Sequence, residues 1–306
     1  MERTPIILDC DPGIDDAIAI LLALSCPDEI RLIGITTCAG NVGLEQTTRN
    51  AGRILTLGGK GNIPVYPGCS RALLSPIARE PEVHGKDGLG GAEFPDAVPL
   101  TTSKHGVDFL TEAIMDNPPD SLTLCATGPL TNLGLAFVKE PRLPERLRKL
   151  VLMGGAVRVP GNMGETATAE FNIHSDPHAA EIVFTSKLKK IVLMSLDVTR
   201  QAVVDGTRLE ALKAAGNRSS KAAASMLENY GRSKKCLHDP LVIAYLLQPD
   251  LFSGPEERIQ VDHQYGRDYG RTSISSDRAR PPVVVMERLD ADGFFKLLSG
   301  QLAKLP

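Results

Sequence analysis

Four aspartates stand within eight residues near the start of the chain, in Asp9-Cys10-Asp11-Pro12-Gly13-Ile14-Asp15-Asp16. The segment lies between two apolar runs and predicts a turn from a strand into a helix. Aspartates in the first turn of a helix complement its dipole or cap it, which would account for one or two of the four. Carboxylates packed this closely repel one another, and their pKa values rise unless a cation compensates. We therefore interpret the segment as a metal site.

The ligand type limits which cation the site would take. The segment offers oxygen ligands and lacks the Cys and His spacing of a zinc site, so Ca²⁺ or Mg²⁺ is indicated. The diol of a sugar is a natural further ligand, and a metal-bound water beside a spare carboxylate would be a nucleophile. Residue chemistry alone indicates this class of site and does not name a substrate.

Further polar side chains follow other apolar runs. Asn41 ends one such turn, and Thr127 begins the turn Thr127-Gly128-Pro129-Leu130-Thr131-Asn132; turn formation is the default reading of both. Glu170 and Asn172 would point the same way if their segment is extended. We expect all of them to meet the aspartates at one sheet edge, where amides and carboxylates suit hydroxyl recognition. No P-loop is present, and no GxGxxG follows the first strand.

His238-Asp239-Pro240 precedes an apolar helical stretch. Asp239 has a structural alternative as the helix N-cap, with Pro240 at the first helical position. A lone histidine before a cap is also more often structural than catalytic. The motif alone therefore leaves its function open.

Short apolar runs alternate with helical patterns along the chain. Near-continuous apolar strands between helices predict an α/β fold with a central, mostly parallel sheet covered on both faces. Residues 67–100 and 154–172 are long Gly-rich segments, and strands from about residue 254 onward could extend the same sheet. We expect a single domain over residues 1–306. Strands are predicted at 5–8, 31–36, 121–126, 150–153 and 190–194, and helices at 17–24, 44–57, 241–247 and 291–303.

Composition excludes several other classes of protein. The 34 basic and 37 acidic residues give a formal charge of −3 and a pI near 6.1, which provides no footprint for nucleic acid or an acidic membrane surface. Six dispersed cysteines without a CxxC pair are typical of core thiols in a reducing compartment. Neither a signal peptide nor an apolar stretch long enough for a bilayer is present, so we expect a cytoplasmic protein without a membrane partner.

The ordered motifs closely resemble the inosine–uridine-preferring nucleoside hydrolases. The aspartate string is followed by the turn with Asn41, and then by Thr-Gly-Pro-Leu-Thr-Asn, Met-Gly-Gly, Ala-Glu-Phe-Asn, Leu-Asp-Val-Thr and His-Asp-Pro, over about residues 5 to 300. The resemblance implies a Ca²⁺-dependent ribonucleoside N-glycosidase on an open α/β fold. It also implies a homodimer or homotetramer and a role in nucleoside salvage.

The resemblance also assigns roles to residues. Asp11, Asp16 and Asp239, with the carbonyl of Thr127, look like the calcium ligands, and Asp15 looks like the general base that deprotonates a calcium-bound water. His238 resembles the group that meets the departing base, and Asp9 a residue that supports the metal cluster. The ribose-binding set looks like Asn41, Asn162, Glu170 and Asn172. His84 lies in a loop that closes over the substrate in relatives. The candidate side chains for stacking against the base are Phe171, His84 and Tyr230.

Departures from the family pattern bear on specificity. The segment between Asn162 and Glu170 is longer than usual, and two lysines, Lys234 and Lys235, stand in the segment that lines the base pocket in relatives. Purine-specific relatives stack the base on tryptophans, one of them at the place of His238, and this chain has no Trp. It thus resembles the pyrimidine-preferring or nonspecific branch, which hydrolyses uridine or cytidine.

Two other functions compete with this interpretation. Mg²⁺-dependent phosphatases of the haloacid-dehalogenase type also have an Asp-x-Asp after the first strand, but they follow it with Gly-Thr or a similar pair where Pro12-Gly13 stands here. A non-catalytic, calcium-dependent nucleoside-binding protein would carry the same motifs. Release of ribose from uridine distinguishes the three.

Overall fold

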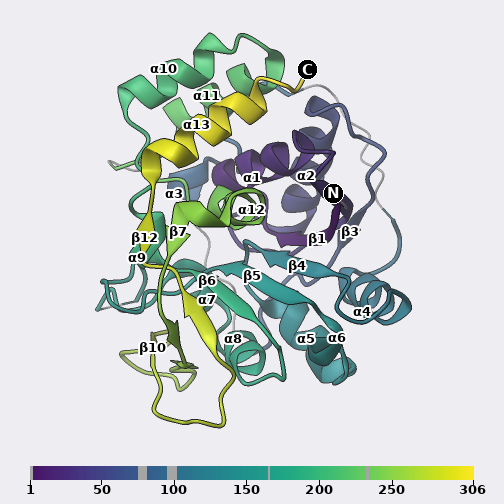
Figure 1. Ribbon diagram of the computed structural model, residues 1–306, viewed down its shortest axis with the longest axis vertical. Coiled ribbons are helices and arrows are strands. Elements are labelled where there is room, and N and C mark those ends of the chain that lie inside the picture. The colour runs from purple at the N-terminus through teal and green to yellow at the C-terminus, as the bar shows by residue number, and fades with distance from the viewer. Residues whose placement is uncertain (1–2, 75–80, 95–101, 165, 232–233) are drawn as a thin grey trace.

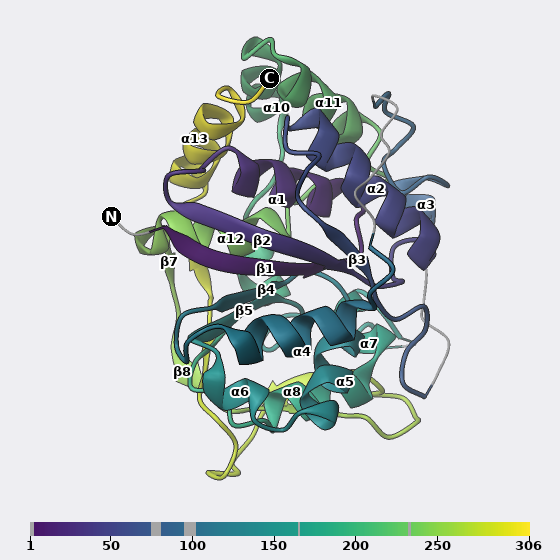
Figure 2. The same cartoon turned by 90° about the vertical axis from the view of Figure 1, so that its right-hand side faces the viewer.

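The fold consists of a central sheet with helices packed on both of its faces (Figures 1 and 2). The computed structural model describes residues 3–74, 81–94, 102–164, 166–231 and 234–306. Among these residues eight strands form the sheet, in which all neighbours pair in parallel except β11 with β8. In spatial order they are β3 (Val65–Pro67), β2 (Ile30–Thr37), β1 (Thr4–Cys10), β4 (Thr123–Ala126), β5 (Lys149–Met153), β6 (Ile191–Met194), β11 (Val283–Val285) and β8 (Glu256–Glu257).

Two helical layers cover the sheet, each over its own hydrophobic core (Figure 2). One layer contains α1 (Ile14–Leu24), α2 (Leu44–Leu57), α10 (Gly206–Ala214), α11 (Arg218–Glu228), α12 (Pro240–Leu247) and α13 (Ala291–Leu302). The other contains α4 (Gly106–Asp116), α5 (Thr131–Lys139), α6 (Leu143–Arg146) and α8 (Pro177–Phe184). Short helices are α3 (Pro81–His84), α7 (Phe171–Ser175), α9 (Leu196–Thr199) and a 3₁₀ turn at Pro249–Leu251. No helix in the described ranges is long and apolar enough to cross a bilayer.

Helix α1 is unusual because every one of its residues is buried. It packs against α12, whose first residues are buried as well. A helix with apolar residues on all sides belongs in a core, as the run Ala17–Leu24 predicts. Burial of its first turn also takes Asp15 and Asp16 out of water, which is costly unless these carboxylates have partners.

The order of the strands places a crevice at the end of β1. The chain adds β2 and β3 on one side of β1, and β4, β5 and β6 on the other. Ligands of open α/β sheets bind where the strand order reverses in this way, beyond the carboxyl ends of the strands. Asp9 and Cys10 end β1, and Thr127 follows β4 directly.

The predicted strands and helices are confirmed, apart from small shifts at their ends. The strand expected at 121–126 begins only at Thr123, and the buried helix begins earlier, at Ile14. The expectation for the C-terminal region was only partly right, because β8 and β11 join the sheet while four short strands do not. Those form separate pairs, β9 (Ile259–Val261) with β10 (Thr272–Ile274) and β7 (Phe252–Ser253) with β12 (Arg288–Leu289). Residues 75–80 and 95–101 of the first Gly-rich segment lie outside the described residues.

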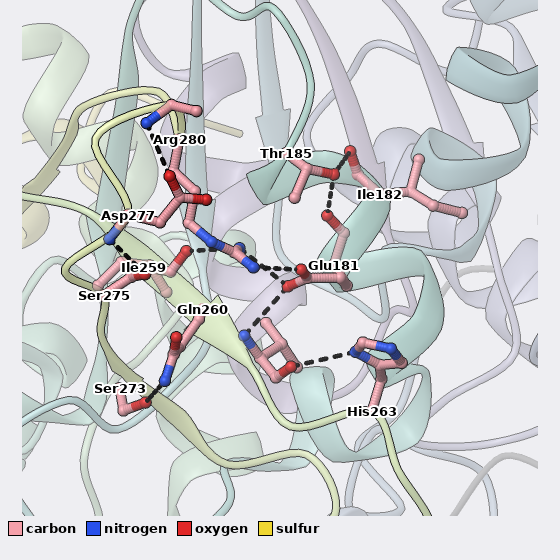
Figure 3. Close-up of polar contacts among 12 residues, drawn as sticks. Glu181, Ile182, Thr185, Ile259, Gln260, His263, Ser273, Ser275, Asp277 and Arg280 are labelled. Atoms are coloured by element: carbon pink, nitrogen blue, oxygen red, sulfur yellow. Dashed lines mark hydrogen bonds and ion pairs between the residues drawn. The ribbon is translucent and has the colours of Figure 1, made fainter.

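An ion pair fastens the β9–β10 hairpin to the body of the molecule (Figure 3). Arg280 donates to Glu181 on α8 at 2.5 Å and to the carbonyl oxygen of Ile259 at 3.0 Å, while Glu181 accepts from the amide of Val261 at 3.1 Å. Both charged side chains are mostly buried, with exposed fractions of 16% and 17%. Because a charged pair with further hydrogen bonds is costly to break, the hairpin is anchored although it lies outside the main sheet.

Candidate active site

The first two aspartates are held at the end of β1 by neighbouring strands and turns. Asp9 Oδ1 accepts hydrogen bonds from the hydroxyl of Thr36 and from the amide Nδ2 of Asn132, the latter at 2.8 Å. Asp11 Oδ2 accepts the backbone N–H of Asn41 at 2.7 Å. Burial raises the pKa of Asp9 to about 7. These two hydrogen bonds fix Asp9 at the end of β1, beside the turn that carries Asp11.

The backbone closes tightly around Asp11. A Cβ atom on Gly40 would lie 2.0 Å from Asp11 Oδ2, and one on Gly128 would lie 2.6 Å from Oδ1, so a side chain at either position would displace the Asp11 carboxylate. Asp11 Oδ1 is buried and has no hydrogen-bond partner among the described residues. Burial and the charge of Asp16 raise the pKa of Asp11 well above its usual range. A buried carboxylate oxygen without a donor fits the ligand set of a cation.

Asp15, Asp16 and Asp239 form a cluster in which one oxygen from each carboxylate lies within 4.8 Å of the others. Asp16 Oδ2 accepts the N–H of Gly13 at 3.0 Å, and its Oδ1 accepts the hydroxyl of Thr127 at 2.8 Å. Asp16 therefore does cap the first turn of α1, which is the structural role that the sequence allowed for one or two of the four aspartates. Capping of α1 does not account for the other two carboxylates of the cluster, those of Asp15 and Asp239.

Asp239 precedes α12 as its N-cap, but its side chain makes no capping hydrogen bond. Asp290 before α13 shows the usual arrangement, since its carboxylate accepts the N–H of Gly293 at 3.0 Å. The carboxylate of Asp239 instead reaches Asp15 and Asp16. Capping by its side chain is thus the wrong reading of Asp239 in His238-Asp239-Pro240, although Pro240 does begin the helix.

The electrostatics of this cluster call for a positive charge. Burial, and next the charge of Asp16, raise the pKa of Asp15 to about 7. Burial and the charge of Asp15 raise the pKa of Asp239 well above its usual range. The described residues that line the adjoining pocket include no Lys or Arg. A hard divalent cation bound to these oxygens would remove the mutual repulsion, so the residues present fit a Ca²⁺ or Mg²⁺ site.

Ten of the twelve predicted site residues line one pocket above the cluster. The two exceptions are Asp11 and Asp16, which lie behind the wall and contact Asn41, whose Nδ2 donates to the Asp11 carbonyl and to Asp16 Oδ2, both at 3.1 Å. The lining consists of Asp15, Asn41, His84, Thr127, Met153, Asn162, Glu170, Phe171, Asn172, Leu196, Tyr230, His238 and Asp239.

Glu170 and Asn172 reach this pocket by a different route from the one predicted. The segment is not extended, because Glu170 is the N-cap of α7 and Asn172 lies in its first turn. The Glu170 carboxylate accepts N–H groups from Gly155, Asn172 and Ile173 at 2.8, 3.0 and 3.2 Å. Asn172 Nδ2 donates to the carbonyl oxygen of Thr127 at 2.8 Å. Three backbone donors fix the carboxylate in one orientation.

The longer segment between Asn162 and Glu170 folds back on itself. The N–H groups of Asn162 and Met163 both donate to the Ala169 carbonyl, at 2.8 and 2.9 Å, and Ala167 adopts a φ of 49° within the turn. Residue 165 lies outside the described residues. Because the extra length is taken up within the turn, Asn162 still lines the pocket, with its Oδ1 buried and unpartnered among the described residues.

Two histidines line the remaining wall. His84 at the end of α3 accepts the N–H of Ile14 at its Nδ1, at 3.1 Å, and its ring lies 5.5 Å from that of Tyr230. His238 pairs its Nδ1 with the hydroxyl of Thr199 at 2.8 Å. The neighbouring residues 232 and 233, in the segment expected to line the base pocket, lie outside the described residues.

Two pocket residues were missed from the sequence. Met153 ends β5 and Leu196 begins α9 just after β6. Both stand at the carboxyl end of a predicted strand, the edge of the sheet where ligands bind. That position is the one sequence feature that could have indicated them as pocket residues. Their apolar character makes them indistinguishable by sequence from the residues of the hydrophobic core.

Comparisons with known proteins show the family of this chain. The family model described as inosine-uridine preferring nucleoside hydrolase matches residues 6–296. The pyrimidine-specific ribonucleoside hydrolase RihA of Citrobacter koseri is 38% identical over 98% of this chain and 98% of its own, and that of Escherichia coli K12 is 37% identical over 97% and 98%.

Solved structures of similar proteins cover the same length. A plant nucleoside hydrolase superposes with a TM-score of 0.89 at 30% identity over 99% of both chains. A purine-preferring ribonucleoside hydrolase from Gardnerella vaginalis gives 0.88 at 32% identity over 98% of both. A phosphatase of the haloacid-dehalogenase type is thereby ruled out. The chain belongs to the inosine-uridine preferring nucleoside hydrolase family and is a ribonucleoside hydrolase.

Proposed function

We propose that this enzyme hydrolyses pyrimidine ribonucleosides at the Asp15–Asp16–Asp239 cluster with the help of Ca²⁺. The observation that carries the proposal is the meeting of these three buried carboxylates at the base of a pocket walled by amides, a carboxylate and histidines. Such a pocket matches a substrate with a polyhydroxylated ring at one end and a planar base at the other.

The metal ligands we propose are Asp11, Asp16, Asp239 and the carbonyl oxygen of Thr127. All are oxygen donors, and the buried Asp11 Oδ1 has no described hydrogen-bond donor. Ca²⁺ accepts six to eight such ligands in flexible geometry, whereas Mg²⁺ demands a near-ideal octahedron. When bound, the ion would hold the ribose diol and lower the pKa of water.

The ribose would lie against Asn41, Asn162, Glu170 and Asn172. Two of these side chains are fixed before substrate arrives: Asn172 by the Thr127 carbonyl, and Glu170 by three backbone N–H groups. Fixed partners lower the entropic cost of orienting the sugar. Carboxylates nearby also favour the positive charge that develops on the ribose as the glycosidic bond breaks.

Asp15 is the proposed general base. As the C1′–N bond breaks, its electron pair leaves with the base, water adds to C1′, and Asp15 accepts the proton of that water. Burial, the largest cause of the raised pKa of Asp15, makes this carboxylate a better proton acceptor than one in water. His238, which lines the same pocket, would assist the departing base as its ring gains electron density.

The proposed base preference rests on the pocket and the relatives. His84, Phe171 and Tyr230 offer the stacking surfaces, and the chain contains no Trp. The two RihA relatives, at 37–38% identity, are described as pyrimidine-specific. The purine-preferring Gardnerella structure is 32% identical, so family membership alone does not set the preference.

We also propose a homo-oligomer in the cytoplasm that serves nucleoside salvage. The compartment is supported by the six cysteines, which are all free thiols and mostly buried. The oligomer rests on the family resemblance and would be measured by light scattering of the purified protein.

Release of ribose tests the proposed function directly. The purified protein is incubated with uridine, cytidine or inosine after treatment with a chelator, and again with added Ca²⁺ or Mg²⁺. We expect free ribose and base with Ca²⁺, at least as fast from uridine or cytidine as from inosine. Binding without ribose release would contradict hydrolysis, full activity in the chelator would contradict the metal, and a strong preference for inosine would contradict the base assignment alone.

A further inference from the structure

The hydroxyl of Thr199 has one partner among the described residues, and that partner is His238. Thr199 is fully buried at the end of α9, and its Oγ1 lies 2.8 Å from His238 Nδ1. A buried hydroxyl whose proton points at no acceptor loses the free energy of a hydrogen bond. The Thr199 proton therefore goes to His238 Nδ1, which accepts it as an unprotonated ring nitrogen.

The direction of this bond fixes the tautomer of the ring. When Nδ1 accepts, the proton of a neutral imidazole is on Nε2. His84 in the same pocket has the same arrangement. Its Nδ1 accepts the backbone N–H of Ile14, a group that can only donate. Two different donors thus leave both pocket histidines with an N–H at Nε2.

Helix α9 is itself held firmly, so that Thr199 is a fixed donor. The Asp197 carboxylate accepts the N–H groups of Val157 and Arg158 at 2.9 and 2.8 Å and the hydroxyl of Ser195 at 2.8 Å. These bonds join the start of α9 to the segment that follows β5. The hydroxyl of Thr199 consequently stays in place while the ring of His238 is oriented against it.

We propose that Thr199 is a positioning residue, which holds His238 in the Nε2–H tautomer, so that Nε2 is the ring nitrogen that donates to the departing base. The proposal rests on the proposed role of His238 toward the leaving group. The electron pair of the broken C1′–N bond passes to the base, and the Nε2–H donates a hydrogen bond to the charge that develops there. Thr199 itself does not touch the substrate.

The test compares two substrates in the calcium-loaded enzyme. Thr199→Val removes the hydroxyl and keeps the shape, so kcat/KM for uridine should fall roughly 10–100-fold, as when the orienting partner of a metal-bound histidine is lost. The loss should lie in kcat more than in KM. Hydrolysis of p-nitrophenyl riboside should be largely retained, because its leaving group needs no assistance. Thr199→Ser, which keeps the hydroxyl, should restore uridine hydrolysis.

A matched control removes another buried hydroxyl. Thr123 is fully buried on β4, and its Oγ1 has no partner among the described residues, so Thr123→Val should leave both activities unchanged. Equal losses on both substrates in Thr199→Val would show a general structural role and overturn the proposal. Unchanged uridine hydrolysis in that variant would overturn it as well.

The tautomer of His238 can also be measured directly by NMR, without an activity assay. ¹⁵N signals of the imidazole in the wild-type protein should show a protonated Nε2 and an unprotonated Nδ1 at His238, and Thr199→Val should give a mixture. A protonated Nδ1 in the wild type would overturn the proposal. If the wild type releases no ribose from any nucleoside, the proposed function fails, and these signals still decide the hydrogen bond.

Discussion

Asp15 and Asp239 stand at the starts of helices far apart in the chain, yet their carboxylate oxygens lie within 4.8 Å of each other. Asp15 stands in the first turn of α1 and Asp239 directly before α12, and the two helices pack side by side (Figure 1). Positive helix ends favour both charges but each offers only about half a unit charge. Two buried carboxylates at this distance therefore need a cation for both to be ionised, and this requirement yields the first prediction.

Asp239→Asn should lose metal and activity together. The substitution keeps the shape but removes a charged ligand, so we expect a loss of about 3–5 kcal/mol in transition-state stabilisation, or ~10²–10⁴-fold in kcat/KM. Metal content is measured by elemental analysis after gel filtration, and activity by ribose release. Asp290→Asn makes the same change at the N-cap of α13, far from the site, and should alter neither. An Asp239→Asn protein with full metal content and normal turnover would remove Asp239 from the site.

Asp15→Asn should separate chemistry from metal binding. The amide keeps an oxygen toward the cluster but cannot accept the proton of water, and loss of a general base costs ~10²–10⁴-fold. We expect this loss in kcat, with Ca²⁺ affinity largely kept. Asp16→Asn is the matched comparison and should lose Ca²⁺. Near-normal kcat in a calcium-loaded Asp15→Asn protein would mean that another group takes the proton.

How far the sequence predicts this site depends on the kind of interaction involved. The aspartate string indicated a metal because mutual repulsion of carboxylates follows from spacing alone. The choice between capping and metal binding at Asp239 could not be made, since it depends on where α1 packs against α12. An extended segment would place Glu170 and Asn172 on one face, whereas the capping bonds of Glu170 to Gly155 and to α7 require a contact from another strand end.

The fold shows the same limit. The apolar run Ala17–Leu24 predicts a buried helix because its burial follows from composition, whereas Leu44–Leu57 mixes polar and apolar residues and buries only one face of its helix. The short strands β9 and β10 carry an alternating pattern that says nothing about which strand they pair with. Their placement depends on the Arg280–Glu181 ion pair, a tertiary contact that no local pattern reveals (Figure 3).

Stability of the metal-free protein should fall as pH rises from about 4 to about 7. Burial raises the pKa values of Asp9 and Asp15 from 3.8 to about 7, so between these limits the folded state binds more protons than the unfolded state. The free energy of unfolding then decreases with pH, and the contribution is lost once pH passes the folded pKa.

Saturating Ca²⁺ should flatten this decline, because the ion replaces the protons on the cluster. The midpoint of thermal unfolding, measured from pH 4.5 to 7.5 in chelator and in Ca²⁺, tests both statements. The part due to Asp9 should persist in Ca²⁺ and disappear in Asp9→Asn. Identical slopes with and without Ca²⁺ would show that the cluster does not bind the ion.

His238→Ala should slow natural nucleosides far more than an activated substrate. Uracil and cytosine lack the N7 whose protonation activates a purine, so their departure demands more help from the wall that His238 and Tyr230 form. We expect kcat/KM for uridine to fall ~10²–10⁴-fold, the usual range for a lost acid–base group, while p-nitrophenyl riboside is hydrolysed at close to the normal rate. His263→Ala changes a histidine on the β9–β10 hairpin and should affect neither substrate. If His238→Ala slows both substrates equally, His238 instead orients the ribose or supports Asp239, and the leaving-group role fails while the hydrolase assignment stands.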